Sequence, residues 1–307
     1  MNNKNHLKNI VNDVRYPPVT FKEIFSDVFK PHSKNDLIKK LFVKPSKDNM
    51  IADWDKPWLF LWVFGLLTLL TIIFYLGMQS YGYLISFYRI LSSMIVPVTL
   101  SILIWEMDIC KNISAIDMFL LIIIGGVVGV ALGVNVNKIY ISSSNQSYLA
   151  GITEESVKLV VCILYIILKK RGFYCLDGLA IGAAVAAGFS FMETVGYSYQ
   201  YGTDVIFKRS FDQLLTGGHV LFTAPFVGAL CYRMWGRKFE WRFLTDSQFL
   251  LTFAICMMEH AVHNMKFEIM PIFGNMLSVK TLLLAVVGWS ILIYMFSIGY
   301  RQLSGQS

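Results

Sequence analysis

Charged residues are scarce in this chain of 307 residues: Asp, Glu, Lys and Arg make up 15% of it, against 55% for hydrophobic residues. A soluble globular domain carries about a quarter charged residues, so a water-soluble enzyme is not expected. The chain also lacks heptads and low-complexity stretches, which excludes coiled coils, collagen and disordered proteins. The composition therefore indicates a membrane protein.

Cysteines are also few, and they form no CxxC pair. An odd number of cysteines in or beside apolar runs predicts neither a disulfide framework nor a thiolate metal site. The five are Cys110, Cys162, Cys175, Cys231 and Cys256. The net charge of +7 does not indicate nucleic-acid binding, because basic residues on the cytoplasmic side of a membrane protein account for most of such an excess.

Long apolar runs, in contrast, are abundant. There are about eight between Pro57 and Tyr300, and each is long enough to cross a hydrocarbon core of roughly 30 Å as a helix. We therefore expect an all-α, polytopic membrane bundle of about eight transmembrane helices. The predicted spans are 57–78, 83–105, 116–134, 148–168, 177–199, 214–234, 247–266 and 277–299.

The first 56 residues differ in character from the rest. They are rich in lysine and contain no apolar run of spanning or signal-peptide length. We predict a basic cytoplasmic segment at 1–56, followed by the bundle at 57–307. Residues 36–43 (DLIKKLFV) have the pattern either of a short amphipathic helix resting on anionic lipid or of a solvated tail.

The loop charges predict the orientation of the bundle. An even number of spans returns the C-terminus to the side of the basic N-terminus, and the intervening loops on that side carry 169–171 (KKR), Arg237, Lys238 and Arg242. We expect a multi-pass cell-membrane protein with both termini in the cytoplasm. The outer loop with Lys208 and Arg209 is the exception to the basic-inside pattern.

Small residues recur at four-residue spacing in two of the spans. This arrangement lets helix backbones approach closely, so we interpret both stripes as packing surfaces. The fifth span, which is also rich in alanine, is expected in the middle of the bundle. The stripes are Gly125, Gly129 and Gly133, and Gly178, Gly182 and Ala186.

Ionisable residues are concentrated in the fourth to seventh spans. Each charge at membrane depth costs about 2.5 to 3.5 kcal/mol or more, so such residues need partners or a wet cavity. With a rise of about 1.5 Å per residue, four helices bring them to one level, roughly 10 Å below the outer boundary. A shared depth indicates a site in the outer leaflet. The residues are Glu154, Glu155, Lys158, Glu193, His219, Glu259, His260 and His263.

Helical spacing predicts which of these groups lie together. Lys158 follows Glu154 by four residues and Glu155 by three, so its ammonium can keep a carboxylate ionised. His260 and Asn264, also four apart, present an imidazole and a carboxamide on one helix face. A desolvated carboxylate is a strong base, which suits the activation of water for peptide hydrolysis.

These residues carry a family resemblance. The motifs are GITEESVKLV at 151–160, DGLAIGAAVAAGFSFMETVGY at 177–197, GGHVLFTAPFVG at 217–228 and EHAVHN at 259–264. Together they resemble the PrsW family of glutamic-type intramembrane proteases, within the superfamily of CAAX endopeptidases and bacteriocin-processing proteases. The resemblance covers residues 148–268, the expected catalytic core. Two departures are Thr194, where the family often has Asn, and the additional His263.

The resemblance implies an intramembrane endopeptidase that needs no cofactor. Glu154 would activate water, Glu155 would be tuned by Lys158, and Glu193 or His219 would complete the water site. His260 and Asn264 would polarise the scissile carbonyl, and Arg209 would pair with Glu193, hold substrate or remain an interfacial charge. The implied substrate is a membrane-anchored protein, such as a single-span anti-sigma factor.

Three alternatives remain at this point. His219, His260 and His263 with Glu193 or Glu155 have the ligand chemistry for zinc, although no HExxH motif is present. Buried Glu, Lys and His also line ion paths, so a transporter or proton relay is the second alternative. No inverted repeat is visible, and the polar residues gather at one leaflet, which argues against transport. A pure assembly role is the third.

Overall fold

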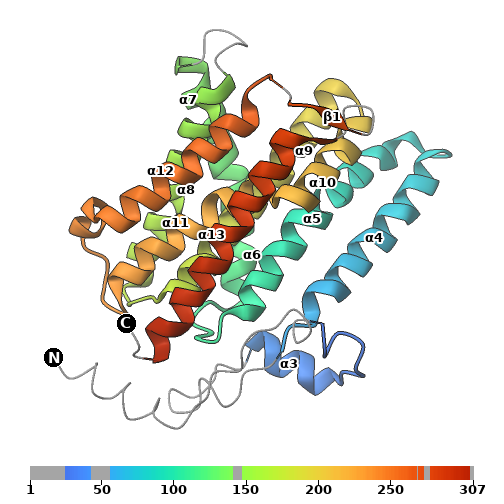
Figure 1. The fold of residues 1–307 in the computed structure, drawn as a ribbon. Helices are drawn as coiled ribbons and strands as arrows, with labels where there is room; N and C mark the ends of the chain where they lie inside the picture. Colours follow the sequence, from blue (N-terminus) through green and yellow to red (C-terminus); the bar gives the residue numbers. More distant parts are fainter. Residues whose placement is uncertain (1–24, 43–55, 141–146, 268, 273–276, 305–307) are drawn as a thin grey trace.

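The computed structural model describes residues 25–42, 56–140, 147–267, 269–272 and 277–304, and these form a helical bundle (Figure 1). The fold class is therefore all-α, as expected. The helices are α3 (Lys34–Phe42), α4 (Leu59–Met78), η1 (Gly82–Leu84), α5 (Ile85–Met107), α6 (Ala115–Ile124), η2 (Gly125–Gly129), α7 (Val130–Tyr140), α8 (Ser147–Lys169), α9 (Cys175–Tyr201), α10 (Asp204–Thr216), α11 (Gly218–Met234), η4 (Trp241–Thr245), α12 (Ser247–Asn264) and α13 (Val279–Ser304). A short antiparallel pair, β1 (Pro271–Ile272) and β2 (Leu277–Ser278), precedes α13.

Among the residues that the structure describes, six segments are long and apolar enough to cross a membrane. This finding confirms a multi-pass membrane protein, but not the number eight. Helices α8 and α12 match two of the expected spans and are not among the six; α8 carries Glu154, Glu155 and Lys158 within two turns. The six are Leu59–Met78, Gly82–Met107, Ala115–Tyr140, Cys175–Tyr201, Asp204–Met234 and Val279–Leu303.

Two predicted boundaries were wrong. The third span does not end at residue 134: a π-helical turn, η2, joins α6 to α7, so Asn137 and Lys138 lie on a helix instead of in an outer loop. Lys208 and Arg209 also lie on a helix, α10, which is amphipathic and separated from α11 by Gly217 with φ +69°. In both places a helix contains polar residues whose composition is typical of a loop.

Helix α9 lies at the centre of the bundle, where nearly all of it is buried. Its glycines allow close contact with α11: a Cβ at Gly182 would lie 2.8 Å from the Cα of Ala224. On another face, a Cβ at Gly125 of η2 would lie 2.2 Å from the carbonyl oxygen of Val185 in α9. The interpretation of the small residues as packing surfaces, and of the fifth span as central, is thus confirmed.

A methyl group at Gly188 is expected to destabilise the bundle. The Cβ of Gly188→Ala would lie 1.9 Å from the carbonyl oxygen of Ile122, so α6 and α9 would have to separate. Overpacking of this kind costs about 1 to 3 kcal/mol or more. Thermal unfolding in detergent should show a lower midpoint for Gly188→Ala. The control is Gly65→Ala, where nothing lies within 4 Å of the added methyl; equal midpoints for the two variants would refute the packing argument.

The described part of the N-terminal segment is tied to the bundle through Glu106, at the end of α5. Its carboxylate accepts hydrogen bonds from the backbone N–H groups of Trp58, Leu59 and Phe60, at the start of α4. Lys40 of α3 forms a buried ion pair with the same carboxylate at 2.7 Å. Of the two alternatives for residues 36–43, the helix is present, as α3 over Lys34–Phe42. Residues 1–24 and 43–55 lie outside the described residues, and the division at residue 56 stays a proposal.

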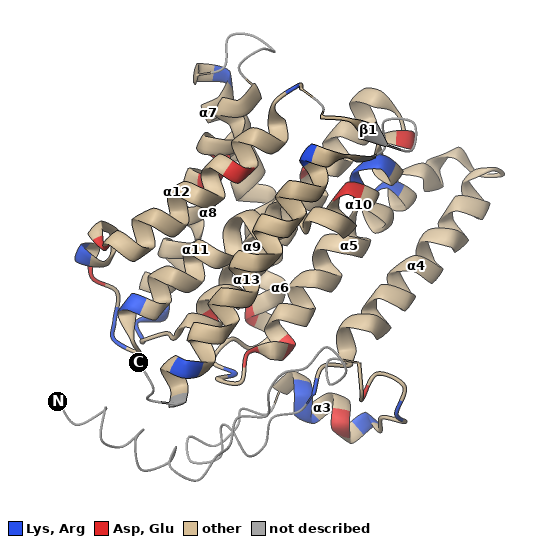
Figure 2. Cartoon of the chain, viewed as in Figure 1, with Lys and Arg blue, Asp and Glu red and all other residues tan. Residues whose placement is uncertain are grey.

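The bundle has two distinct ends. At one, called the C-terminal end, the end of α13 meets the ends of α5 and α11: Tyr300 donates to the carbonyl oxygen of Met107, and Gln302 to that of Tyr232. At the other, called the site end, the start of α8 meets the end of α12, where Ser147 donates to the carbonyl oxygen of Asn264. Lys and Arg gather at both ends, whereas the middles of α4 and α13 have neither (Figure 2).

Candidate active site

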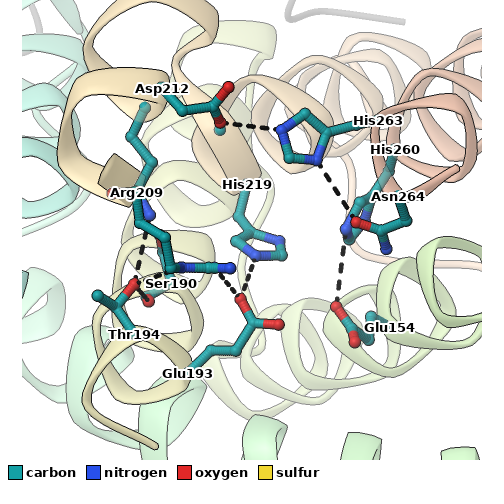
Figure 3. A network of polar contacts seen from close by, with 12 residues as sticks. Glu154, Ser190, Glu193, Thr194, Arg209, Asp212, His219, His260, His263 and Asn264 are labelled. Carbon is teal, nitrogen blue, oxygen red and sulfur yellow. Dashed lines mark hydrogen bonds and ion pairs between the residues drawn. The ribbon is translucent and has the colours of Figure 1, made fainter. Parts of the chain in front are cut away.

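Polar side chains from α8, α9, α11 and α12 meet near the site end (Figure 3). Lys158 Nζ lies 2.6 Å from Glu155 Oε1 and 2.8 Å from His219 Nδ1. His260 Nδ1 lies 2.8 Å from Glu155 Oε1, and His219 Nε2 lies 2.9 Å from Glu193 Oε2. The structure therefore brings together five of the residues that the sequence singles out, from four helices, at one level.

Glu155 is fully buried, and donors surround its carboxylate. Oε1 accepts from Lys158 and His260, and Oε2 accepts from the hydroxyl of Thr223 at 2.6 Å. A carboxylate with this many donors is held as an anion. Glu155 is thus suited to positioning: it binds the ammonium of Lys158 and fixes the orientation of the His260 ring.

The hydrogen bonds of Glu155 and Lys158 also determine where the two imidazoles carry their protons. The Lys158 ammonium has only donors, so His219 Nδ1 accepts from it and His219 Nε2–H donates to Glu193. His260 Nδ1–H donates to the Glu155 carboxylate, which leaves the lone pair of His260 Nε2 free. The two histidines therefore differ: His219 uses both ring nitrogens, and His260 uses one.

Glu154 faces the free nitrogen of His260. Its Oε2 lies 3.7 Å from His260 Nε2, is buried, and has no hydrogen-bond partner, while its Oε1 accepts from Asn137 Nδ2 at 3.2 Å. When Glu154 is ionised, neither of these two acceptors can donate to the other, so the pair lacks a hydrogen-bond donor. In a cluster whose other groups are paired, these two acceptors have the polarity to bind a water molecule beside them.

Asn137 is a site neighbour that sequence reasoning missed. It reaches Glu154 from α7, and its carbonyl oxygen accepts a short hydrogen bond from the hydroxyl of Thr153. The available signal was an asparagine just beyond the predicted third span, at the end of an apolar run. Asn137 holds one oxygen of Glu154 and thereby directs the other toward His260.

Arg209 pairs with Glu193, as one of the sequence alternatives proposed. Its guanidinium donates to Glu193 Oε2, its Nε donates to Thr194 Oγ1 at 3.1 Å, and it lies over the ring of Tyr197. Thr194, the departure from the family motif, thus helps to orient the arginine. Because Glu193 also accepts from His219, the amphipathic helix α10 is connected to the buried cluster.

Asn264 and His263 lie at the edge of the cluster. His263 Nδ1 is 3.4 Å from Asn264 Oδ1, and His263 Nε2 is 2.9 Å from Asp212 Oδ2 on α10. No hydrogen bond among the described residues joins these three to Glu154 or Glu155. Glu259 does not join the cluster either: its carboxyl is buried against Gly288 of α13 and has no hydrogen-bond partner there.

A cavity of about 380 Å³ extends from the buried cluster along α10 toward the start of α13. It reaches Glu193, His219 and His260, while Glu154 lies behind them and does not line it. Both charges and aromatic rings face the cavity, which suits a polypeptide segment. The lining residues are Glu193, Tyr197, Tyr201, Val205, Lys208, Arg209, Asp212, Gln213, Gly218, His219, Phe222, His260, His263, Asn264, Ser278, Lys280 and Thr281.

The free ligand atoms of the cluster decide whether it can hold a metal ion. Glu154, His219 and His260 each offer a ligand atom within 4.8 Å of the others, and zinc accepts such donors. However, His219 has no lone pair left, because Lys158 uses one ring nitrogen and the proton on the other binds Glu193. Only two open donors remain, and a buried ammonium lies beside them. In this arrangement the residues do not fit a resident zinc ion.

Comparison with known proteins identifies a family. The family model described as PrsW family intramembrane metalloprotease matches residues 112–296. No curated protein and no solved structure matches the chain. The match contains every residue of the buried cluster, and it begins before α7, the helix that supplies Asn137.

Proposed function

Because this chain belongs to the PrsW family of intramembrane proteases, we propose that it cleaves membrane-anchored proteins with a water molecule activated by Glu154. The family membership makes the chain a peptide hydrolase that acts within a bilayer. The class of catalysis, the roles of the residues and the position of the cut are our proposal. The observation that carries it is the pair of unpartnered acceptors, Glu154 Oε2 and His260 Nε2, 3.7 Å apart.

A water molecule about 2.8 Å from each of these acceptors can donate one hydrogen to each. Its lone pair is then free to attack the carbonyl carbon of a peptide bond, while Glu154 takes its proton. Glu155 contributes by holding His260 with the proton on Nδ1, so that Nε2 remains an acceptor. The proton held by Glu154 is available for the leaving amine, which balances the hydrolysis.

The groups that line the cavity would hold the substrate. The carboxamide of Asn264 can donate to the scissile carbonyl oxygen as negative charge develops on it. His260 cannot do this while its Nε2 accepts from water, so the proposal moves this role from the His260 and Asn264 pair to Asn264 alone. Arg209 fixes Glu193, which in turn orients His219 beside the water site.

The charges at the C-terminal end support an orientation. The loops there contain 169–171 (KKR), Arg237, Lys238 and Arg242, and basic loops remain in the cytoplasm. We therefore place both termini in the cytoplasm of a cell-membrane protein and the site in the outer leaflet. The family resemblance favours a single-span regulator of the anti-sigma type as substrate.

The position of the cut tests this placement. We expect fragments released from a single-span substrate to end within the outer third of its span, because the cavity lies at the site end. Mass spectrometry of fragments from cells with the wild-type chain, compared with cells that lack it, would measure the position. Fragments that end near the cytoplasmic boundary would contradict the orientation, and the absence of any released fragment would contradict the proteolysis.

We further expect the metal content of the purified protein to be the same in the wild type and in His260→Ala. The reason is that the hydrogen bonds of His219 leave the cluster one donor short of a zinc site. Elemental analysis of both proteins, purified side by side, is the measurement. A metal ion that is stoichiometric in the wild type and lost from His260→Ala would establish a metal-dependent mechanism instead.

A further inference from the structure

A second buried cluster lies at the C-terminal end of the bundle. Asp108 and Cys110, in the loop after α5, meet Asp177 of the first turn of α9, and one ligand atom from each lies within 4.8 Å of the others. Asp108 and Asp177 are fully buried, and Cys110 is 2% exposed. Asp177 begins the DG motif of the sequence, and the proposed hydrolysis makes no use of it.

Each carboxylate uses one oxygen and leaves the other without a partner. Asp177 Oδ2 accepts from the backbone N–H of Tyr174 at 2.8 Å and from Asn112 Nδ2 at 2.9 Å, and Asp108 Oδ1 accepts from the N–H of Cys110 at 2.9 Å. Asp177 Oδ1 and Asp108 Oδ2 are buried and have no hydrogen-bond partner. A buried, unpaired carboxylate oxygen is costly, so two of them in one cluster need either a shared proton or a cation between them.

Burial raises the pKa of Asp108, while nearby donors and positive charge act in the opposite direction. Asp177 lies in the first turn of α9, where the helix dipole stabilises negative charge, and its donors are a backbone N–H and an amide. Lys111 acts electrostatically on Asp108, while its Nζ donates to the carbonyl oxygens of Trp105 and Glu106. When both carboxyls are ionised, they and the one ammonium leave negative charge in a buried place, which a divalent cation would neutralise.

We propose that Asp108, Cys110 and Asp177 bind a structural zinc ion, as one thiolate and two carboxylate ligands. The thiol distinguishes zinc from calcium and magnesium, which prefer oxygen ligands alone. Cys110 binds as the thiolate, so its proton is released to solvent when the ion enters. This assignment departs from the expectation from cysteine spacing alone, because the ligands come from two segments 67 positions apart in the chain.

The proposed ion is remote from the hydrolytic site. Asp177 and Glu193 lie sixteen residues apart on α9, which corresponds to about 24 Å along the helix. The ion would join the loop after α5 to the start of α9. Its role is therefore to fix two helix ends, and it takes no part in the activation of water.

The test is elemental analysis of the full-length protein purified in detergent from cells supplied with zinc. We expect about one zinc ion per chain in the wild type, less than a fifth of that in Cys110→Ser and Asp177→Asn, and no loss in Glu154→Gln. Cys256→Ser is the matched control, because Cys256 is equally buried but lies outside the cluster. It should keep its zinc.

A second measurement does not depend on the folding of the variants. Wild-type protein from cells grown with cobalt in place of zinc should show the thiolate-to-cobalt charge-transfer band. Absence of both zinc and this band in folded wild-type protein would overturn the proposal and indicate that the two carboxyls share a proton. Zinc that persists in folded Cys110→Ser, or that is lost from Glu154→Gln, would overturn it as well.

Discussion

Replacement of Glu154 by Gln is expected to lower the rate of substrate cleavage by about 10² to 10⁴-fold, the usual contribution of a general base. Gln keeps the size of the side chain and can keep the hydrogen bond from Asn137 Nδ2 to its carbonyl oxygen. It cannot accept a proton from water. Cleavage of a single-span reporter by purified protein in lipid vesicles, followed on gels over time, is the measurement.

The matched control for this variant is Ser156→Ala. Ser156 lies two residues further along α8, is exposed, and hydrogen-bonds only the carbonyl oxygen of Ile152. We expect it to cleave the reporter at the wild-type rate. If Glu154→Gln elutes as folded protein in size-exclusion chromatography and still cleaves at the rate of Ser156→Ala, Glu154 is not the base.

Replacement of Lys158 by Met is expected to destabilise the protein by about 3 to 5 kcal/mol, because it leaves the carboxylate of Glu155 buried and short of a charge partner. The Lys158 and Glu155 side chains are both fully buried and lie 2.6 Å apart. The same change removes the donor to His219 Nδ1, so cleavage should be lost as well. Thermal unfolding in detergent would show a lower midpoint for Lys158→Met than for the wild type.

The double variant Glu155→Gln with Lys158→Met separates the charge from the packing. It removes both members of the ion pair, so its unfolding midpoint should lie above that of Lys158→Met, although its cleavage should stay low because Gln holds the His260 ring less firmly. The matched control is Ser156→Ala, with an unchanged midpoint. A double variant less stable than Lys158→Met would show that the ion pair does not account for the loss.

The sequence predicted the bundle well because membrane spans are a property of length and composition. The starts and ends of α4, α5, α8, α9, α12 and α13 lie within a few residues of the predicted spans. The predicted helix boundaries were wrong where polar residues lie on a helix. Asn137 and Arg209 are polar residues on helices at the site end. A prediction based on apolar runs places the end of a helix before such residues.

The site was predictable as a set of residues, but its hydrogen bonds were not. Intramembrane Glu, Lys and His at one depth indicate a cluster, because each would be costly alone. Spacing along α8 leaves open which carboxylate Lys158 binds, and only the helix orientations assign it to Glu155 and leave Glu154 facing His260. The partners of Arg209 and His263 depend on where α10 packs, which no local pattern encodes.

The packing of α9 has a consequence for the biogenesis of the protein. Its neighbour η2 is synthesised before it and its neighbour α11 after it, and both contacts depend on glycines without room for a Cβ. During translation, therefore, the helix that contacts one face of α9, η2, is available before α9 is made. The face that contains Gly182 stays uncovered until α11 has been synthesised. In this interval an incomplete nascent chain exposes this face of α9 to lipid.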